Sequence, residues 1–87
     1  MDEAIAVITH YYGHIGVAVL EITGELHLGD LITIQGHTTD FCQQVSSLEL
    51  NHRKIQFAGP GMEAALKVDK PVRRGDRLYK ISELPKE

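Results

Sequence analysis

Cysteine, tryptophan and long apolar runs are scarce or absent in this 87-residue chain. The single cysteine, Cys42, cannot close a disulfide within the chain, so we expect a reducing, cytoplasmic environment. The longest apolar stretch, 15–20, is interrupted by Gly16 and is far shorter than the roughly 20 residues that cross a bilayer. We therefore expect no membrane partner and a single small domain over residues 1–87, with an ordered core at about 3–81 and a frayed end at 82–87.

Positive charge is missing from the first 50 residues. This part contains seven acidic residues and no Lys or Arg, for a charge of −7, whereas 51–87 contains nine basic and five acidic residues, for a charge of +4. The resulting net charge of −3 argues against non-specific binding of nucleic acid, which needs several cations to neutralise phosphates. The basic residues of the second part could still form a local basic face, or folding could interleave the two halves.

No catalytic residue, metal site or cofactor is predicted. His10 and His14 lie on an extended segment, where four residues span roughly 13 Å, too far for one zinc ion. The Gly-rich segment 59–62 lacks the Gly-Lys-Ser/Thr ending that holds nucleotide phosphates, so GTP is not expected as a ligand. Cys42 is interpreted as a small buried apolar residue, and the aspartates of two Gly-Asp turns, Asp30 and Asp76, as turn caps.

Short segments of β-branched, aromatic and alternating apolar residues predict strands separated by Gly turns. We expect extended structure over 3–12, 17–22, 26–28, 31–35, 41–50, 54–58, 62–68 and 78–81. No segment has sustained helical periodicity, so the fold class is all-β. Six or seven short strands at this spacing favour a single small closed β-barrel, since closure leaves no free sheet edge.

The segment 41–50 has an internal irregularity. Phe41 and Val45 have odd numbers, whereas Leu48 and Leu50 have even numbers, so a regular strand would place them on opposite faces. An extra residue near Ser46 and Ser47 would restore one face, which predicts a bulge or kink there.

The order of several motifs resembles the second, β-barrel domain of translational GTPases such as elongation factor Tu, and also small translation-elongation-factor-like proteins. These motifs are Gly-Val-Ala-Val-Leu-Glu-Ile at 16–22, Gly-Glu-Leu at 24–26, Leu-Gly-Asp at 28–30, Ile-Thr-Ile at 32–34, Thr-Asp-Phe at 39–41, Val-Ser-Ser-Leu-Glu at 45–49, Asn-His at 51–52 and Val-Arg-Arg-Gly-Asp at 72–76. The resemblance covers roughly residues 4–81 and implies a translation-protein barrel.

The resemblance also implies a site. In elongation factor Tu this barrel helps to hold the aminoacyl end of tRNA with apolar residues and a glutamate, which correspond here to Val17, Leu66 and Glu49. His14 replaces the arginine of that family, which weakens phosphate attraction. Basic residues of the segment 51–87 could contact the phosphates of a bound RNA. The expected RNA-binding residues are therefore Val17, Glu49, Leu66, Lys67, Arg73, Arg74 and Arg77.

We therefore expect a non-catalytic, translation-associated binding module that contacts RNA, such as a tRNA-like end, or a ribonucleoprotein. In that case Val17 and Glu49 should share one surface depression. The alternative is a protein-protein docking barrel without RNA contact, and a small-molecule hydrolase ranks last. RNA binding requires a contiguous basic cluster, docking requires an exposed apolar patch, and an enzyme requires a pocket with perturbed ionisable groups.

Overall fold

The computed structural model describes residues 3–81. The regular secondary structure in this range consists of strands, without a helix. The strands are β1 (Ala6–Tyr12), β2 (Val17–Ile22), β3 (Leu26–His27), β4 (Leu31–Gln35), β5 (Asp40–Gln44), β6 (Leu48–Leu50), β7 (Arg53–Lys54), β8 (Phe57–Ala58), β9 (Glu63–Lys67) and β10 (Arg77–Lys80). The all-β prediction is confirmed, although three of the ten strands have two residues each, and the expectation counted six or seven strands. The described residues contain no helix able to span a membrane, and the expected fraying of 82–87 lies outside them.

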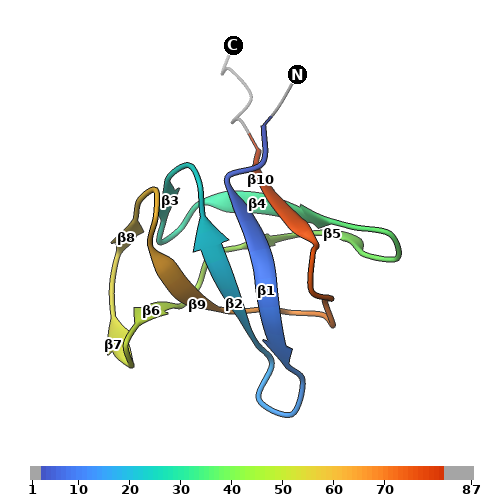
Figure 1. Cartoon of the computed structure of the whole chain (residues 1–87), viewed down its shortest axis with the longest axis horizontal. Coiled ribbons are helices and arrows are strands. Elements are labelled where there is room, and N and C mark those ends of the chain that lie inside the picture. The colour runs from blue at the N-terminus through green and yellow to red at the C-terminus, as the bar shows by residue number, and fades with distance from the viewer. Residues whose placement is uncertain (1–2, 82–87) are drawn as a thin grey trace.

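Eight strands form one antiparallel sheet in the order β5-β4-β10-β1-β2-β9-β6-β7, and β3 pairs with β8 (Figure 1). Neighbours in this order are often distant in sequence, as β10 lies between β4 and β1. Most of the ladder is therefore non-local and depends on one shared core.

The sheet is strongly curled. Strand β5 stands first in the order and β6 seventh, so a flat sheet would separate them by roughly 29 Å at six strand spacings. Only residues 45–47 connect β5 to β6, and a connection of this length spans at most roughly 14 Å. The two ends of the sheet must therefore approach each other.

A side chain bridges the ends of this curled sheet. The Gln43 amide nitrogen on β5 donates to the carbonyl oxygen of Lys67 at 2.9 Å, and its amide oxygen accepts from the Asp69 backbone N–H at 2.8 Å. No backbone ladder joins β5 to β9, β6 or β7 within residues 3–81. The prediction of a closed barrel is therefore wrong, and the sheet is open and curled. A closed barrel would need a backbone ladder between its two ends, but here the Gln43 side chain makes the hydrogen bonds between them.

The interior of the curl contains the hydrophobic core. It consists of sixteen buried apolar residues: Ala6, Ile8, Ala18, Leu20, Ile22, Leu26, Ile32, Ile34, Val45, Leu48, Ala58, Ala64, Leu66, Val68, Val72 and Leu78. On β2, β4 and β9 the buried positions alternate with more exposed ones, as expected for a sheet with one face in the core. The opposite face of β2 and β9 is consequently available at the surface.

The predicted irregularity near Ser46 and Ser47 is confirmed. Strand β5 ends at Gln44 and β6 begins at Leu48, so the expected strand 41–50 consists of two strands with different neighbours. A second irregularity, which the sequence analysis missed, shifts the register of β1 and β2 between Ile8 and His10. The alternation of inward-facing and outward-facing side chains along β1 therefore changes phase at this point.

We expect Gln43→Met to lower the free energy of unfolding by about 1–3 kcal/mol, because methionine keeps the side-chain length but leaves two backbone groups without their partner. Gln43 is only 5% exposed, so water replaces the amide poorly. Urea unfolding followed by circular dichroism measures the change.

The matched control is Gln44→Met. The exposed Gln44 amide donates to the Gly29 carbonyl oxygen, and its loss should cost at most about 0.5 kcal/mol. Equal losses in the two variants would contradict the bridging role of Gln43.

Candidate docking surface

Three of the expected site residues surround one surface depression. Val17 on β2, Glu49 on β6 and Lys67 on β9 line it together with Ser47 and Ala65. These strands are neighbours in the order β2-β9-β6, so residues far apart in sequence meet there. The prediction that Val17 and Glu49 share a depression is confirmed.

The other expected site residues lie elsewhere. Leu66 is fully buried, because alternation along β9 turns it into the core and leaves Ala65 on the outer face. Arg73 and Arg74 precede β10, and Arg77 begins it, on the far side of β1 from β2 and β9. The depressions that Glu49 lines do not include these arginines.

Strand register arranges the outer face of the sheet in rows. Val17 lies opposite Lys67, and Val19 lies opposite Ala65, which in turn lies opposite Glu49. One row further along, Glu21 lies directly opposite Glu63. The outer face therefore has an apolar centre next to carboxylates.

The largest depression on this face has a volume of about 440 Å³. Its lining residues are Tyr12, Ile15, Val17, Val19, Glu49, His52 and Ala65. Ile15 is 52% exposed and Tyr12 is 44% exposed, so both offer apolar area that a partner could bury. A second depression continues the surface past Glu49 to Asn51 and Glu63.

We call this surface the acidic apolar face and define it as Tyr12, Ile15, Val17, Val19, Ala65, Glu21, Glu49 and Glu63. In residues 3–81 the ion pairs are those that Asp30 forms with His27 and Lys80, so the three glutamates have no ionic partner in the described part. Like charges directly opposite each other on a sheet destabilise it, and Glu21 and Glu63 have that arrangement.

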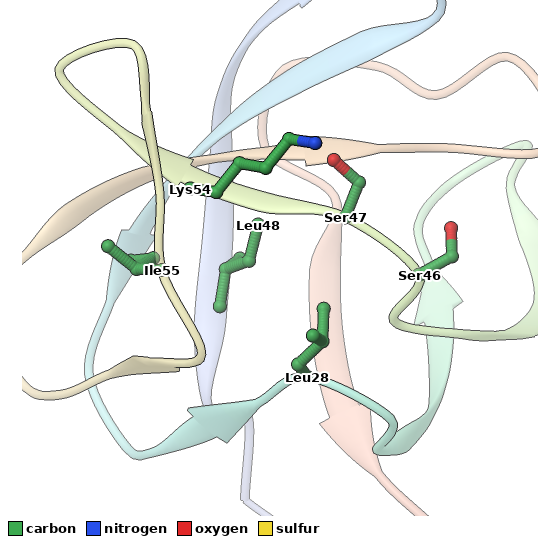
Figure 2. Close-up of a pocket in the computed structure, with 6 residues that line it drawn as sticks. All are labelled: Leu28, Ser46, Ser47, Leu48, Lys54 and Ile55. Atoms are coloured by element: carbon green, nitrogen blue, oxygen red, sulfur yellow. The ribbon is translucent and has the colours of Figure 1, made fainter.

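Two lysines lie beside Glu49, and within residues 3–81 neither forms an ion pair with it. The Lys67 ammonium donates to the carbonyl oxygen of Ile15 at 3.4 Å. Lys54 lies opposite Glu49 in the ladder, but its side chain extends over a separate depression of about 280 Å³, toward Ser47 (Figure 2). Leu28, Ser46, Ser47, Leu48, Lys54 and Ile55 line that depression.

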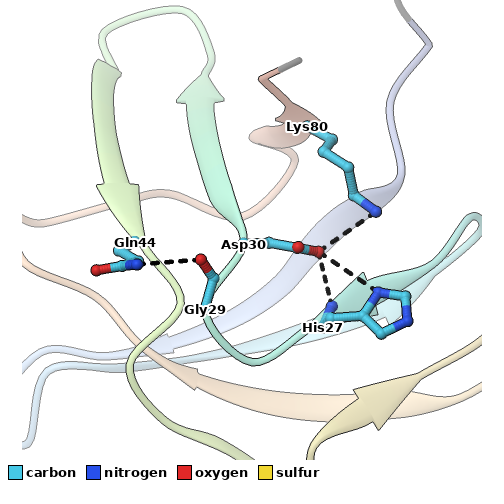
Figure 3. Close-up of polar contacts among 5 residues, drawn as sticks. All are labelled: His27, Gly29, Asp30, Gln44 and Lys80. Carbon is cyan, nitrogen blue, oxygen red and sulfur yellow. Dashed lines mark hydrogen bonds and ion pairs between the residues drawn. The ribbon is translucent and has the colours of Figure 1, made fainter. Parts of the chain in front are cut away.

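The two Gly-Asp turns have the same hydrogen bonds, which explains both aspartates structurally. The Asp30 carboxylate accepts from the His27 backbone N–H at 2.8 Å, and the Asp76 carboxylate accepts from the Arg73 backbone N–H at 2.8 Å. The preceding glycines, at 29 and 75, both have φ of 93°, which favours glycine. Asp30 also pairs with the Lys80 ammonium at 3.3 Å (Figure 3).

Asp76 adds a packing constraint on the neighbouring strand end. Its carboxylate occupies the space that a Cβ at Gly36 would need, so a side chain at that position would overlap it. Asp76 is 4% exposed and is thus a buried turn cap. The interpretation of both Gly-Asp aspartates as turn caps is confirmed by these hydrogen bonds.

Two histidines border the acidic apolar face: His52 lines its largest depression, and His10 lies opposite Val19. The expectation that Cys42 is buried is wrong, because it is an exposed free thiol on β5. The His10 ring stacks on Tyr12 with centroids 6.2 Å apart. Among residues 3–81, no group of three His, Cys, Asp or Glu side chains is placed to hold a metal ion. The distinctive chemistry of the face is therefore apolar contact combined with negative charge.

Comparisons with known proteins place the chain beside peptidases. It is 34% identical over 77 residues to an uncharacterised protease of Methanocaldococcus jannaschii, a match that covers 87% of this chain and 19% of the relative. It is 37% identical over 73 residues to a collagenase of Porphyromonas gingivalis, covering 82% of this chain and 20% of the relative. The chain spans about a fifth of the length of these curated relatives. No protein-family model matches.

The fold also matches that of a solved protein domain. The structure superimposes on the crystal structure of the C-terminal domain of a Geobacillus thermoleovorans protein assigned to the U32 peptidases, with a TM-score of 0.86 and 18% identity over 93% of both chains. At this identity the likeness establishes the fold alone.

These comparisons overturn the resemblance to translation factors. The curated relatives are named as a protease and a collagenase, and the matching solved domain comes from a U32 peptidase. The expected translation-associated, RNA-binding function is therefore wrong. The resemblance depended on glycine turns and alternating apolar residues. Such features are typical of small β domains in general and do not show what a domain binds.

We expect Glu63→Lys to raise the free energy of unfolding by about 0.2–1 kcal/mol, since it replaces a cross-strand repulsion with Glu21 by an attraction. Urea unfolding at low salt measures the gain, which should shrink at high salt.

Glu25→Lys is the matched control, because it makes the same change in net charge at an exposed position outside the strands. Equal stabilisation by the two variants would mean that the net charge, and not the opposition of Glu21 and Glu63, causes the effect.

Proposed function

We propose that this chain is an accessory module of a U32-type peptidase, without a catalytic centre of its own, which docks a polypeptide on the acidic apolar face. It works beside a catalytic region located in the remaining part of such a protein. A cytoplasmic location belongs to the same proposal, because reducing compartments preserve a free, exposed thiol such as that of Cys42.

The observation that carries this proposal is the way the curated matches are distributed. The alignments include more than four fifths of this chain but only about a fifth of each named protease. A segment that corresponds almost completely to one small part of a longer enzyme has the character of a module. The fold match to a domain that is C-terminal in a peptidase supports the same interpretation.

The surface supports a docking role. Val17, Val19 and Ala65 form the apolar centre of a sheet face, and the exposed Tyr12 and Ile15 extend it. Apolar residues gathered on an open surface, with polar residues around them, are typical of protein-protein contact sites. A peptidase module with such a face can hold a polypeptide close to the catalytic region.

Grafting into the collagenase of Porphyromonas gingivalis tests the proposal. Deleting its matching 73-residue segment should reduce collagen cleavage by about tenfold or more, because docking raises the local concentration of substrate. Inserting this chain in place of that segment should restore much of the lost cleavage.

An unrelated β domain of similar size, inserted at the same place, is the control and should restore nothing. The proposal fails if the deletion leaves cleavage unchanged, if this chain restores no more than the control domain, or if this chain alone cleaves collagen.

A further inference from the structure

We infer that the acidic apolar face binds a polypeptide segment in which an apolar side chain is flanked by Lys or Arg, and that this segment belongs to the polypeptide substrate of the peptidase. The inference rests on the proposed function and specifies the chemistry of its docking partner. The shape of the face and the charges that the strand register places on it support the inference.

The shape of the face suits an inserted apolar side chain. The depression between β2, β9 and β6 has a volume of about 440 Å³ and is open to the surface. Valine, alanine, isoleucine and tyrosine side chains supply most of its lining. A leucine or an aromatic ring of a partner would cover Val17 and Val19 and release water from them.

The charge of the face selects the neighbours of that apolar side chain. Glu49 lies within the depression, and Glu63 lines the adjoining one. Glu21, opposite Glu63, adds a third carboxylate to the same side. Lysine or arginine on either side of the inserted residue would meet these carboxylates, and opposite charges across a contact favour both association and register.

In the strand register the protein's own cations lie beside Glu49 but not beside Glu21 and Glu63: Glu49 lies opposite Lys54, whereas Glu21 lies between Val7 and Glu63. Lys67 and Lys54 are directed toward Ile15 and Ser47 respectively. Arg77 belongs to the same cross-strand row as Glu21, but Val7 lies between them, which corresponds to a separation of roughly 10 Å. Salt screens much of the interaction between exposed charges at that distance.

The same charges disfavour other occupants. A second copy placed symmetrically would bring two surfaces that each carry Glu21, Glu49 and Glu63 together, and like-charge contacts are costly. The phosphates of a nucleic acid would be repelled in the same way.

Synthetic peptides test the inference with the full chain. The probes are a fluorescent peptide with the central sequence Lys-Leu-Lys and two matched peptides with Glu-Leu-Glu and Lys-Ser-Lys, all titrated by fluorescence anisotropy at low and high salt. The Lys-Leu-Lys peptide should bind about tenfold or more tightly than either of the others, and its affinity should fall as salt rises.

Two variants with the same change in net charge locate the binding site. Glu63→Lys should weaken binding of the Lys-Leu-Lys peptide by about tenfold, whereas Glu25→Lys, outside the face, should change it less than about twofold. Circular dichroism confirms that both variants are folded. Equal effects of the two variants, absence of binding, or equal affinity for the three peptides would overturn the inference.

Two further results separate this inference from the proposed function. If the graft restores collagen cleavage but the Lys-Leu-Lys peptide does not bind, the inference fails while the accessory role stands. If the peptide binds with the expected selectivity but deleting the matching segment leaves cleavage unchanged, the recognition chemistry stands while its link to the peptidase fails. Sedimentation that shows dimers broken by Val19→Asp would assign the face to a second copy and also overturn the inference.

Discussion

The amide of Gln43 joins the two ends of the curled sheet. Its donor and its acceptor both bond backbone groups at the end of β9, at 2.9 Å and 2.8 Å, so the side chain substitutes for two ladder bonds. A backbone ladder at this place would need β5 to run alongside β9, but the three-residue connection to β6 carries the chain away. The amide therefore holds the two ends of the sheet together while leaving the sheet open.

The acidic apolar face depends on the same curvature. Because the sheet curls, the short connection after β5 can deliver β6 to the free side of β9, which places Glu49 opposite Ala65. The inner face of the same three strands contributes Leu20, Leu48 and Leu66 to the core. Core and surface are thus two sides of one set of strand pairs, so stability of the fold and geometry of the docking face are linked.

Local patterns in the sequence predicted the strands, the Gly-Asp turns and the break near Ser46, because each depends on residues within a few positions. Val17 and Glu49 were also placed together correctly, although the resemblance to translation factors that suggested them was wrong. Leu66 was misplaced because alternation along β9 turns it into the core, whereas the neighbouring Ala65 faces outward. The opposition of Glu21 and Glu63 and the bridging role of Gln43 depend on register and curvature, which no local pattern of a single chain contains.

The repeated Gly-Asp turns give the domain a local twofold symmetry. Each turn leads directly into a strand, β4 or β10, and these two strands are antiparallel partners. A rotation of half a turn about an axis between them therefore exchanges both the strands and the turns that precede them. Asp76 reaches across this axis to the end of β4, where Gly36 leaves room for it, and Asp30 reaches across it to Lys80 of β10. One short pattern, used twice, thus secures both ends of a strand pair whose members are more than forty residues apart in the chain.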